Sequence, residues 1–146
     1  MSEGANLAQS FESEFLIRES LIDTFGHVNN SKYLELFEEA RWDIIHGRGF
    51  SIPEIQKNGF GPVVLEVNLR FSKELRLRQK IKIVSIVDQA TSTGKTMTMV
   101  QTMVNEKGEI CCTGKFLFGF FDLKARKLVQ PSREWLHAVG INPQNP

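Results

Sequence analysis

The alternation of apolar and polar residues with a period of two, which begins after Gly59 and continues to about Asp122, constrains the fold most. Such an alternation is typical of β-strands that bury one face. The pattern predicts strands over residues 63–71, 81–87, 95–105 and 109–122, with the turn Asn105–Gly108 joining the last two. These strands are long, since the usual strand has about five or six residues.

An earlier and less regular strand precedes them. The segment 11–22 reads FESEFLIRESLI, and its residues Phe11, Phe15 and Ile17 share one parity with charged residues between them. This pattern predicts a half-buried strand over residues 11–22. The turn residues Asp23 and Gly26 follow it directly.

One long helix is predicted between the first strand and the other four. Asn29 or Asn30 is a suitable N-cap, and glycines at 47 and 49 are suitable stop signals. Apolar residues recur between them at helical spacing and form a wide stripe: Tyr33, Leu34, Leu36, Phe37, Ala40, Ile44 and Ile45. A stripe this wide predicts a central helix that is covered over most of its surface. A short helical turn is expected over 51–58.

The order of the elements predicts an α+β domain in which a sheet wraps the long helix. The 146 residues are enough for one domain with its own core. We expect a single domain over 1–146, with the core at about 11–123 and a C-terminal helix at about 131–139. The sequence contains no repeat or linker that would divide the chain.

Composition excludes several functional classes. A net charge of +1 gives no support for binding to nucleic acid, and no apolar run has the roughly 18 to 20 residues of a membrane span. The N-terminus lacks the features of a signal peptide. Cys111 and Cys112 are neighbours that point to opposite faces of a strand, so a disulfide between them is not expected. We therefore expect a reduced, cytoplasmic protein.

Polar residues without strand or helix periodicity concentrate at Asp23–Asn30, between the first strand and the long helix. The backbone N–H groups at a helix start and the helix dipole both favour a developing oxyanion. A carboxylate a few residues upstream can reach the same space. These two groups are sufficient to hydrolyse a thioester, and no metal is required.

The same segment resembles the signature of the 4-hydroxybenzoyl-CoA thioesterase family of hotdog proteins, in particular its bacterial acyl-CoA thioesterase branch. The residues that carry the resemblance are Asp23, Gly26, His27, Val28, Asn29, Asn30, Tyr33, Glu38, Ala40 and Arg41. The similarity covers about residues 15–121. It implies a hotdog fold, with a long central helix wrapped by a five-stranded antiparallel sheet. It also implies a homodimer or homotetramer with active sites at the dimer interface.

The resemblance assigns roles to individual residues. Asp23 matches the catalytic carboxylate, as nucleophile or as general base, and the backbone N–H of Asn30 matches the group that polarises the thioester carbonyl. His27 is a candidate general base, although it can equally shape the turn. Asn29 and Tyr33 are candidate substrate contacts, and they can equally be a helix cap and a core residue. Gly26 completes the substrate-binding turn.

Cations are needed for the phosphates of coenzyme A, and the resemblance favours the loop containing Gly94 and Lys95. Five basic residues also gather around one turn, either as a solvated rim or as a carrier-protein contact: Arg70, Lys73, Arg76, Arg78 and Lys80. Glu38 and Arg41 are expected to be only a surface pair. The family often has a Gly-Asp pair where this chain has Arg78-Gln79, which affects the turn rather than the chemistry.

The sequence therefore predicts an enzyme that hydrolyses acyl-CoA to a free acid and coenzyme A. It predicts no cofactor apart from the coenzyme A of the substrate, and no metal. Two alternatives remain open. One is hydrolysis of acyl groups on acyl carrier protein, and the other is a hotdog protein that binds acyl-CoA without turnover.

Overall fold

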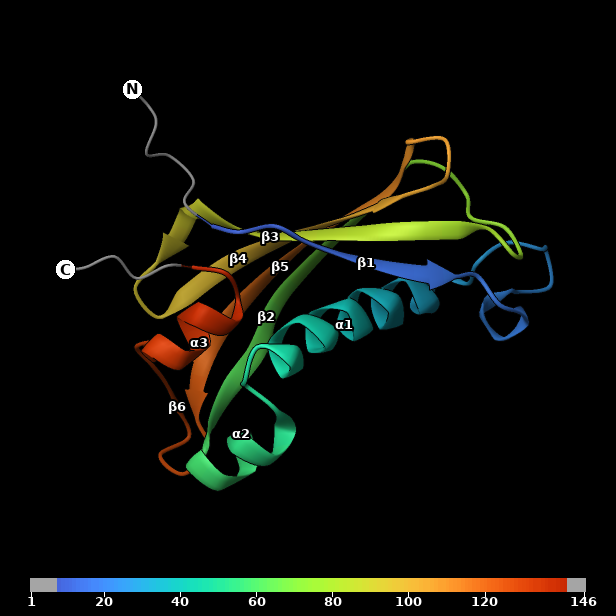
Figure 1. The fold of residues 1–146 in the computed structure, drawn as a ribbon. Coiled ribbons are helices and arrows are strands. Elements are labelled where there is room, and N and C mark those ends of the chain that lie inside the picture. The colour runs from blue at the N-terminus through green and yellow to red at the C-terminus, as the bar shows by residue number, and fades with distance from the viewer. Residues whose placement is uncertain (1–7, 142–146) are drawn as a thin grey trace.

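The structure is a computed structural model that describes residues 8–141 (Figure 1). A long helix lies against one face of an antiparallel sheet, with a shorter helix beside it. The elements in chain order are β1 (Phe11–Leu16), a 3₁₀ turn η1 (Glu19–Leu21), α1 (Asn30–Gly47), α2 (Ile52–Asn58), β2 (Phe60–Phe71), β3 (Lys80–Thr93), β4 (Thr96–Val104), β5 (Ile110–Asp122), β6 (Lys127–Val129) and α3 (Arg133–Ala138).

The sheet has the strand order β1-β3-β4-β5-β2, so β1 and β2 form its two edges. The prediction of an α+β hotdog fold, in which five antiparallel strands and one long helix form the domain, is confirmed. The short strand β6 was not predicted, because three residues are too few to show a period. β4 begins at Thr96 opposite Gly119, and β6 pairs with the last residues of β5, beyond that point.

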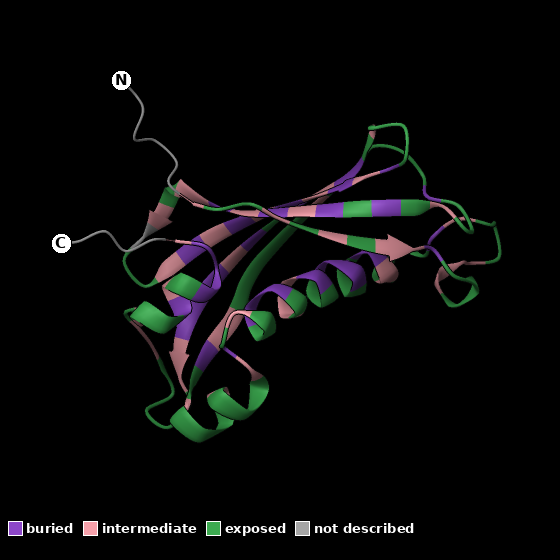
Figure 2. Ribbon diagram, viewed as in Figure 1, coloured by how far each residue is buried: buried purple, intermediate pink, exposed green. Residues whose placement is uncertain are grey.

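Helix α1 begins and ends where the sequence predicts. The Asn29 side chain accepts a hydrogen bond from the Ser31 N–H, which makes Asn29 the N-cap, and the helix ends at Gly47. Figure 2 shows that the face of α1 toward the sheet is the buried one. Its buried residues are Tyr33, Leu36, Phe37, Ala40, Ile44 and Ile45. The Phe37 ring meets the Phe116 ring of β5 edge to face, with 5.5 Å between centroids.

The strand predicted over 11–22 is wrong in its second half, since β1 ends at Leu16. Leu16 pairs with Lys80, the first residue of β3, so no partner strand continues beyond it. The Ile17 N–H still bonds to the Gln79 carbonyl, and the chain then turns into the 3₁₀ segment. An extended strand needs a partner for its backbone groups, and that partner runs out here.

Other features bear on the environment of the protein. Cys111 and Cys112 are both buried and unbonded to each other, as their adjacency in a strand predicts. Within residues 8–141, no helix combines the length and the apolar character that crossing a membrane requires.

Candidate active site

The loop between η1 and α1 is built around the carboxylate of Asp23. Its Oδ1 accepts hydrogen bonds from the backbone N–H of Phe25, at 2.8 Å, and of His27, at 3.2 Å. The Asp23 N–H in turn donates to the His27 carbonyl at 2.8 Å. Gly26 has a φ of +86°, a conformation that glycine adopts without strain. The loop is thus closed on itself, with one carboxylate oxygen holding it.

The start of α1 follows directly. The Asn29 side chain caps the helix by accepting from the Ser31 N–H at 3.0 Å, and the Asn29 carbonyl accepts from the Lys32 N–H. Among the described residues, the backbone N–H of Asn30 has no acceptor. A free N–H at the positive end of a helix of 18 residues is suited to bind an oxyanion.

Asp23 and Asn30 line the same open hollow, whose volume is about 320 Å³. The other residues of its wall are His27, Val28, Tyr33, Phe71, Ser72, Lys73 and Glu74. Four of the predicted site residues are thereby brought together: Asp23, His27, Asn30 and Tyr33. Asn29 and Gly26 belong to the same loop but are not part of the wall.

Tyr33 is both a core residue and part of the hollow, the two alternatives that the sequence left open. The side chain is buried, and its ring packs edge to face on Phe71 with 5.0 Å between centroids. Burial raises the pKa of its phenol, an effect that a hydrogen bond with the backbone of Leu75 partly offsets. Tyr33 is therefore a core residue that also forms part of the hollow.

Glu74 is a site residue that the sequence did not reveal. Its Oε1 lies 2.9 Å from Nε2 of His27, and its Oε2 is paired with the Arg76 guanidinium. His27 is thus held from two sides, through its backbone by Asp23 and through its ring by Glu74. His27 also forms an isolated antiparallel bridge with Arg76. Local pattern gives no sign of this contact, because it joins positions 47 residues apart that lie in two different loops.

Gly94 and Lys95 lie outside this hollow. They form the turn between β3 and β4, whereas the Asp23 loop lies near Lys80 at the opposite end of β3 (Figure 1). With about 3.3 Å per residue, the strand separates them by on the order of 40 Å. Within one chain they do not meet Asp23.

The basic cluster predicted around the β2–β3 connection is largely neutralised. Lys73 lies 3.5 Å from a carboxylate oxygen of Glu109, and Arg78 lies 2.6 Å from one of Glu19. Arg76 pairs with Glu74. Neighbouring carboxylates therefore balance most of the positive charge.

The prediction that Glu38 and Arg41 form a mere surface pair is wrong. The Arg41 guanidinium points into the protein, where Nη1 donates to Oε1 of Gln101 at 2.9 Å. It also lies over the ring of Phe116, 4.4 Å from the centroid. Burial lowers the pKa of Arg41 to about 10, so it remains cationic at neutral pH. An i,i+3 spacing on a helix does not show that one of the two side chains turns inward.

Over residues 8–141, no three side chains of His, Cys, Asp or Glu come close enough together to hold a metal ion. The groups that the hollow offers for chemistry include the carboxylates of Asp23 and Glu74, the imidazole of His27 and the helix-start N–H of Asn30.

Comparison with known proteins gives a family. The family model described as the thioesterase-like superfamily matches residues 17–139. The long-chain acyl-CoA thioesterase FadM of Escherichia coli (strain K12) is 28% identical over 116 residues, which are 80% of this chain and 86% of FadM.

Solved structures are similar over the same region. The probable thioesterase YbaW from Escherichia coli has a TM-score of 0.78 at 26% identity, covering 88% of this chain and 98% of YbaW. The DHNA-CoA thioesterase from Staphylococcus aureus has a TM-score of 0.77 at 25% identity, covering 88% of this chain and 87% of that one.

Proposed function

The chain belongs to the thioesterase-like superfamily, and we propose that it hydrolyses acyl-CoA with Asp23 as the reacting carboxylate and the Asn30 N–H as the oxyanion donor. That it is a thioester hydrolase of the acyl-CoA kind follows from its relatives. The assignment of residues is our proposal. The observation that carries it is that Asp23 and Asn30 line one hollow at the start of α1.

The geometry supports separate chemical roles for Asn30 and Asp23. The thioester carbonyl would accept from the Asn30 N–H, so that the negative charge of the tetrahedral intermediate develops at the positive end of α1. Asp23 would either attack the carbonyl carbon, to give a mixed anhydride that water then cleaves, or take a proton from the attacking water. In both routes the carbon–sulfur bond breaks, the thiolate leaves with coenzyme A and takes up a proton, and the acid is released.

The coenzyme A ester is favoured over the carrier-protein ester by the charge around the site. An acidic carrier protein would need a broad basic surface, and the cations nearest the hollow are paired with Glu19, Glu74 and Glu109. FadM acts on long-chain acyl-CoA, and we propose substrates of that kind here. We also propose that the protein is cytoplasmic, in agreement with its two buried free cysteines.

We propose further that the protein is at least a homodimer, formed through strand β2. This strand is 12 residues long and lies at an edge of the sheet, paired only with β5. It exposes apolar side chains along its length, including Leu65 at 43% and Val67 at 45%. Long apolar edges are normally covered. A partner strand there would extend the sheet, and a second copy could bring its own Gly94 and Lys95 toward this hollow.

Light scattering tests the dimer. Leu65→Glu places like charges at the paired edges and is expected to give a monomer, whereas Leu123→Glu, on a residue that is 42% exposed but outside β2, should leave the mass unchanged. An unchanged mass for both variants would contradict pairing through β2.

Thiol release from a panel of acyl-CoAs tests the activity. Asp23→Asn is expected to lower kcat by a factor on the order of 10² to 10⁴. Asp43→Asn, which changes an exposed carboxylate on α1, is the control and should have little effect. A fully active Asp23→Asn enzyme would rule out the proposed role, and no turnover of any acyl-CoA by the wild type would rule out the proposed function.

A further inference from the structure

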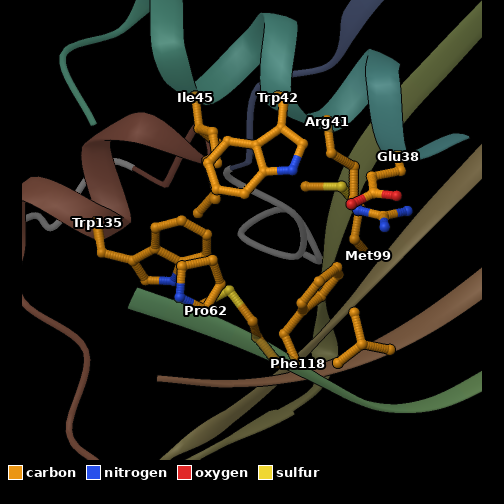
Figure 3. A pocket seen from close by; sticks show the side chains of 11 residues that line it. Glu38, Arg41, Trp42, Ile45, Pro62, Met99, Phe118 and Trp135 are labelled. Carbon is orange, nitrogen blue, oxygen red and sulfur yellow. The ribbon is translucent and has the colours of Figure 1, made fainter. Parts of the chain in front are cut away.

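A separate cavity of about 130 Å³ lies between the second half of α1, strand β2 and helix α3 (Figure 3). It is lined by Glu38, Arg41, Trp42, Ile45, Pro62, Val64, Met97, Met99, Phe118, Trp135 and Val139. A dry apolar cavity of about 150 Å³ is able to hold a molecule of the size of benzene. This cavity is therefore large enough for the end of a ligand, but not for a whole long acyl chain.

The lining of the cavity is apolar except for three hydrogen-bond donors, the side chains of Arg41, Trp42 and Trp135, and one acceptor, the carboxylate of Glu38. Figure 3 shows the rings of Trp42 and Trp135 turned into the cavity from α1 and α3, with Arg41 and Glu38 at one side. Neither indole N–H donates to another described residue, and since no buried side-chain nitrogen or oxygen among them lacks a partner, both N–H groups are open to the cavity or to solvent. Arg41 donates one hydrogen bond, to Gln101, and its other N–H groups have no acceptor among the described residues. The Glu38 carboxylate is near enough to raise the pKa of Arg41, against the larger effect of burial. A ligand oxygen would thus meet several free donors here, with the exposed Glu38 carboxylate as an acceptor beside them.

An apolar row on β2 joins this cavity to the Asp23 hollow. Phe71 touches Tyr33 of α1 and lines the hollow, and Val64 lines the cavity. Between them Val67 is paired with Phe116, whose ring contacts the α1 residue Phe37, so Val67 faces the helix as well. These side chains face α1 and nevertheless stay exposed: Val64 by 43%, Val67 by 45% and Phe71 by 50%. They line an apolar track between the helix and the edge strand.

The length of this track follows from the helix. Asn30 at the hollow and Arg41 at the cavity are 11 residues apart on α1, which corresponds to roughly 16 Å at about 1.5 Å per residue. With carbon–carbon bonds of about 1.5 Å in a zigzag, an extended acyl chain needs roughly 12 to 14 carbons to cover it. A chain that starts with its carbonyl at Asn30 would place its far end in the cavity.

We infer that this cavity receives the distal end of the acyl chain and favours chains of roughly 12 to 14 carbons that carry a terminal hydroxyl group. The hydroxyl oxygen accepts from the Arg41 guanidinium and the Trp42 indole N–H, and the hydroxyl group donates to Glu38, which lies at the same side of the cavity (Figure 3). A plain methyl end would fill the same space and leave these donors unpaired, which costs binding energy. The inference rests on the proposed function, because it takes the carbonyl to be bound at Asn30.

A series of acyl-CoA substrates of increasing chain length tests the inferred preference. The kcat/KM of ω-hydroxyacyl-CoAs from 8 to 16 carbons is divided by that of the plain acyl-CoA of equal length. For the wild type, the ratio is expected to peak at roughly 12 to 14 carbons. Trp42→Phe removes one donor and keeps an aromatic ring, and it should lower the peak by roughly three- to tenfold. A ratio that does not vary with length, or a peak that Trp42→Phe leaves intact, would overturn the inference.

A second pair of variants tests the position of the chain end. Val64→Phe fills the cavity and should shift the preferred length of plain acyl chains downward. Leu123→Phe is its matched control, since Leu123 has a similar exposure of 42% and lies outside both β2 and the cavity. Equal shifts in both variants would contradict a chain end in this cavity.

Binding measured without turnover separates this inference from the proposed function. Calorimetric titration of Asp23→Asn with dodecanoyl-CoA and with 12-hydroxydodecanoyl-CoA should show tighter binding of the hydroxylated ester, by roughly three- to tenfold. Adding Trp42→Phe should reduce the difference. This result would support the cavity even if no acyl-CoA were hydrolysed, and equal affinities would overturn it even in an active enzyme.

Discussion

Oδ1 of Asp23 accepts a hydrogen bond from the backbone N–H of His27 at 3.2 Å, and the same oxygen accepts from Phe25 at 2.8 Å. The other carboxylate oxygen has no donor among the described residues. One oxygen of Asp23 therefore stabilises the loop while the other is free to react. The turn role and the chemical role, which are competing readings of the sequence, belong to one side chain.

Two substitutions of Asp23 are expected to separate these roles. Asp23→Asn keeps an oxygen for the two N–H groups and should retain most of the stability while losing turnover. Asp23→Ala removes the acceptor as well, and should lower the free energy of unfolding by about 1 kcal/mol more. Urea unfolding and thiol release on the same samples check both effects. Equal stability of the two variants would show that the carboxylate does not stabilise the loop.

Glu74 is expected to matter for activity more than for stability. Glu74→Ala leaves the His27 ring free to rotate in the hollow and should lower kcat/KM by roughly three- to tenfold. The free energy of unfolding should change by less than about 1 kcal/mol, because the pair is substantially exposed. Glu12→Ala, which breaks the exposed pair with Lys82, is the control and should leave kcat/KM unchanged. Equal kinetics for both variants would remove Glu74 from the site.

Gln101 is expected to be among the most sensitive polar positions. It is fully buried, accepts from Arg41, and donates to the Phe37 carbonyl at 3.1 Å and to Ser85 Oγ at 2.9 Å. Gln101→Leu leaves a buried cation without its acceptor and should lower the free energy of unfolding by about 2 to 4 kcal/mol. Thr102→Leu, at the next position of β4, should change it by about 0.5 kcal/mol or less. Urea denaturation of both variants measures the difference.

Arg78 carries backbone strain that a glycine would relieve. Its φ is +68°, in the left-handed region that glycine adopts without strain. Arg78→Gly should raise the free energy of unfolding by roughly 1 kcal/mol, although it gives up the exposed pair with Glu19. Arg78→Ala loses the pair and keeps the strain, so it should be less stable than wild type. Thermal unfolding measures the melting temperatures of the two variants. A shift of both melting temperatures in the same direction from wild type would contradict the strain at Arg78.

Stability is expected to fall at alkaline pH because of Cys112. Burial raises the pKa of its thiol from 9.0 to about 12, so the unfolded chain loses this proton at a lower pH than the folded one. Above pH 9 the unfolded state is therefore favoured, by up to about 1.4 kcal/mol per pH unit. Arg41, with its pKa lowered to about 10, acts in the opposite direction only above that pH.

The window between pH 9 and 10 reports mainly on the thiols, since the buried phenol of Tyr33, whose pKa is also raised, has its ordinary pKa at the upper end of this window. Burial raises the pKa of Cys111 as well, so both cysteines contribute with the same sign. Cys112→Ala should flatten the decline of the unfolding free energy over this window. A variant that declines as steeply as wild type would assign the effect to other groups.

Much of the fold is predictable from local pattern. The period of two defines β2 to β5, and helical spacing between an N-cap and a glycine defines α1. The meeting of Asp23 with Asn30 is predictable for the same reason, since only seven positions separate them and the helix start fixes both.

The remaining features depend on contacts that local pattern does not contain. β1 ends at Leu16 because β3 begins at its partner Lys80, a fact about the other strand. Arg41 turns inward because Gln101, 60 positions away, offers it an acceptor. Glu74 reaches His27 because two loops meet at the end of the sheet. Each of these requires the sheet to be assembled first.

Helix α1 runs without a break from Asn30 to Gly47 and carries both the oxyanion donor and the residues of the distal cavity. The distance between them is therefore set by the number of helical residues that separate them. A single insertion or deletion in this stretch would rotate one end of the helix by about 100° relative to the other. Descendants of this chain can alter their preferred substrate length gradually only by changing the bulk of side chains at the far end. Loop lengths, which vary most freely in evolution, do not affect the distance along α1 between Asn30 and the distal cavity.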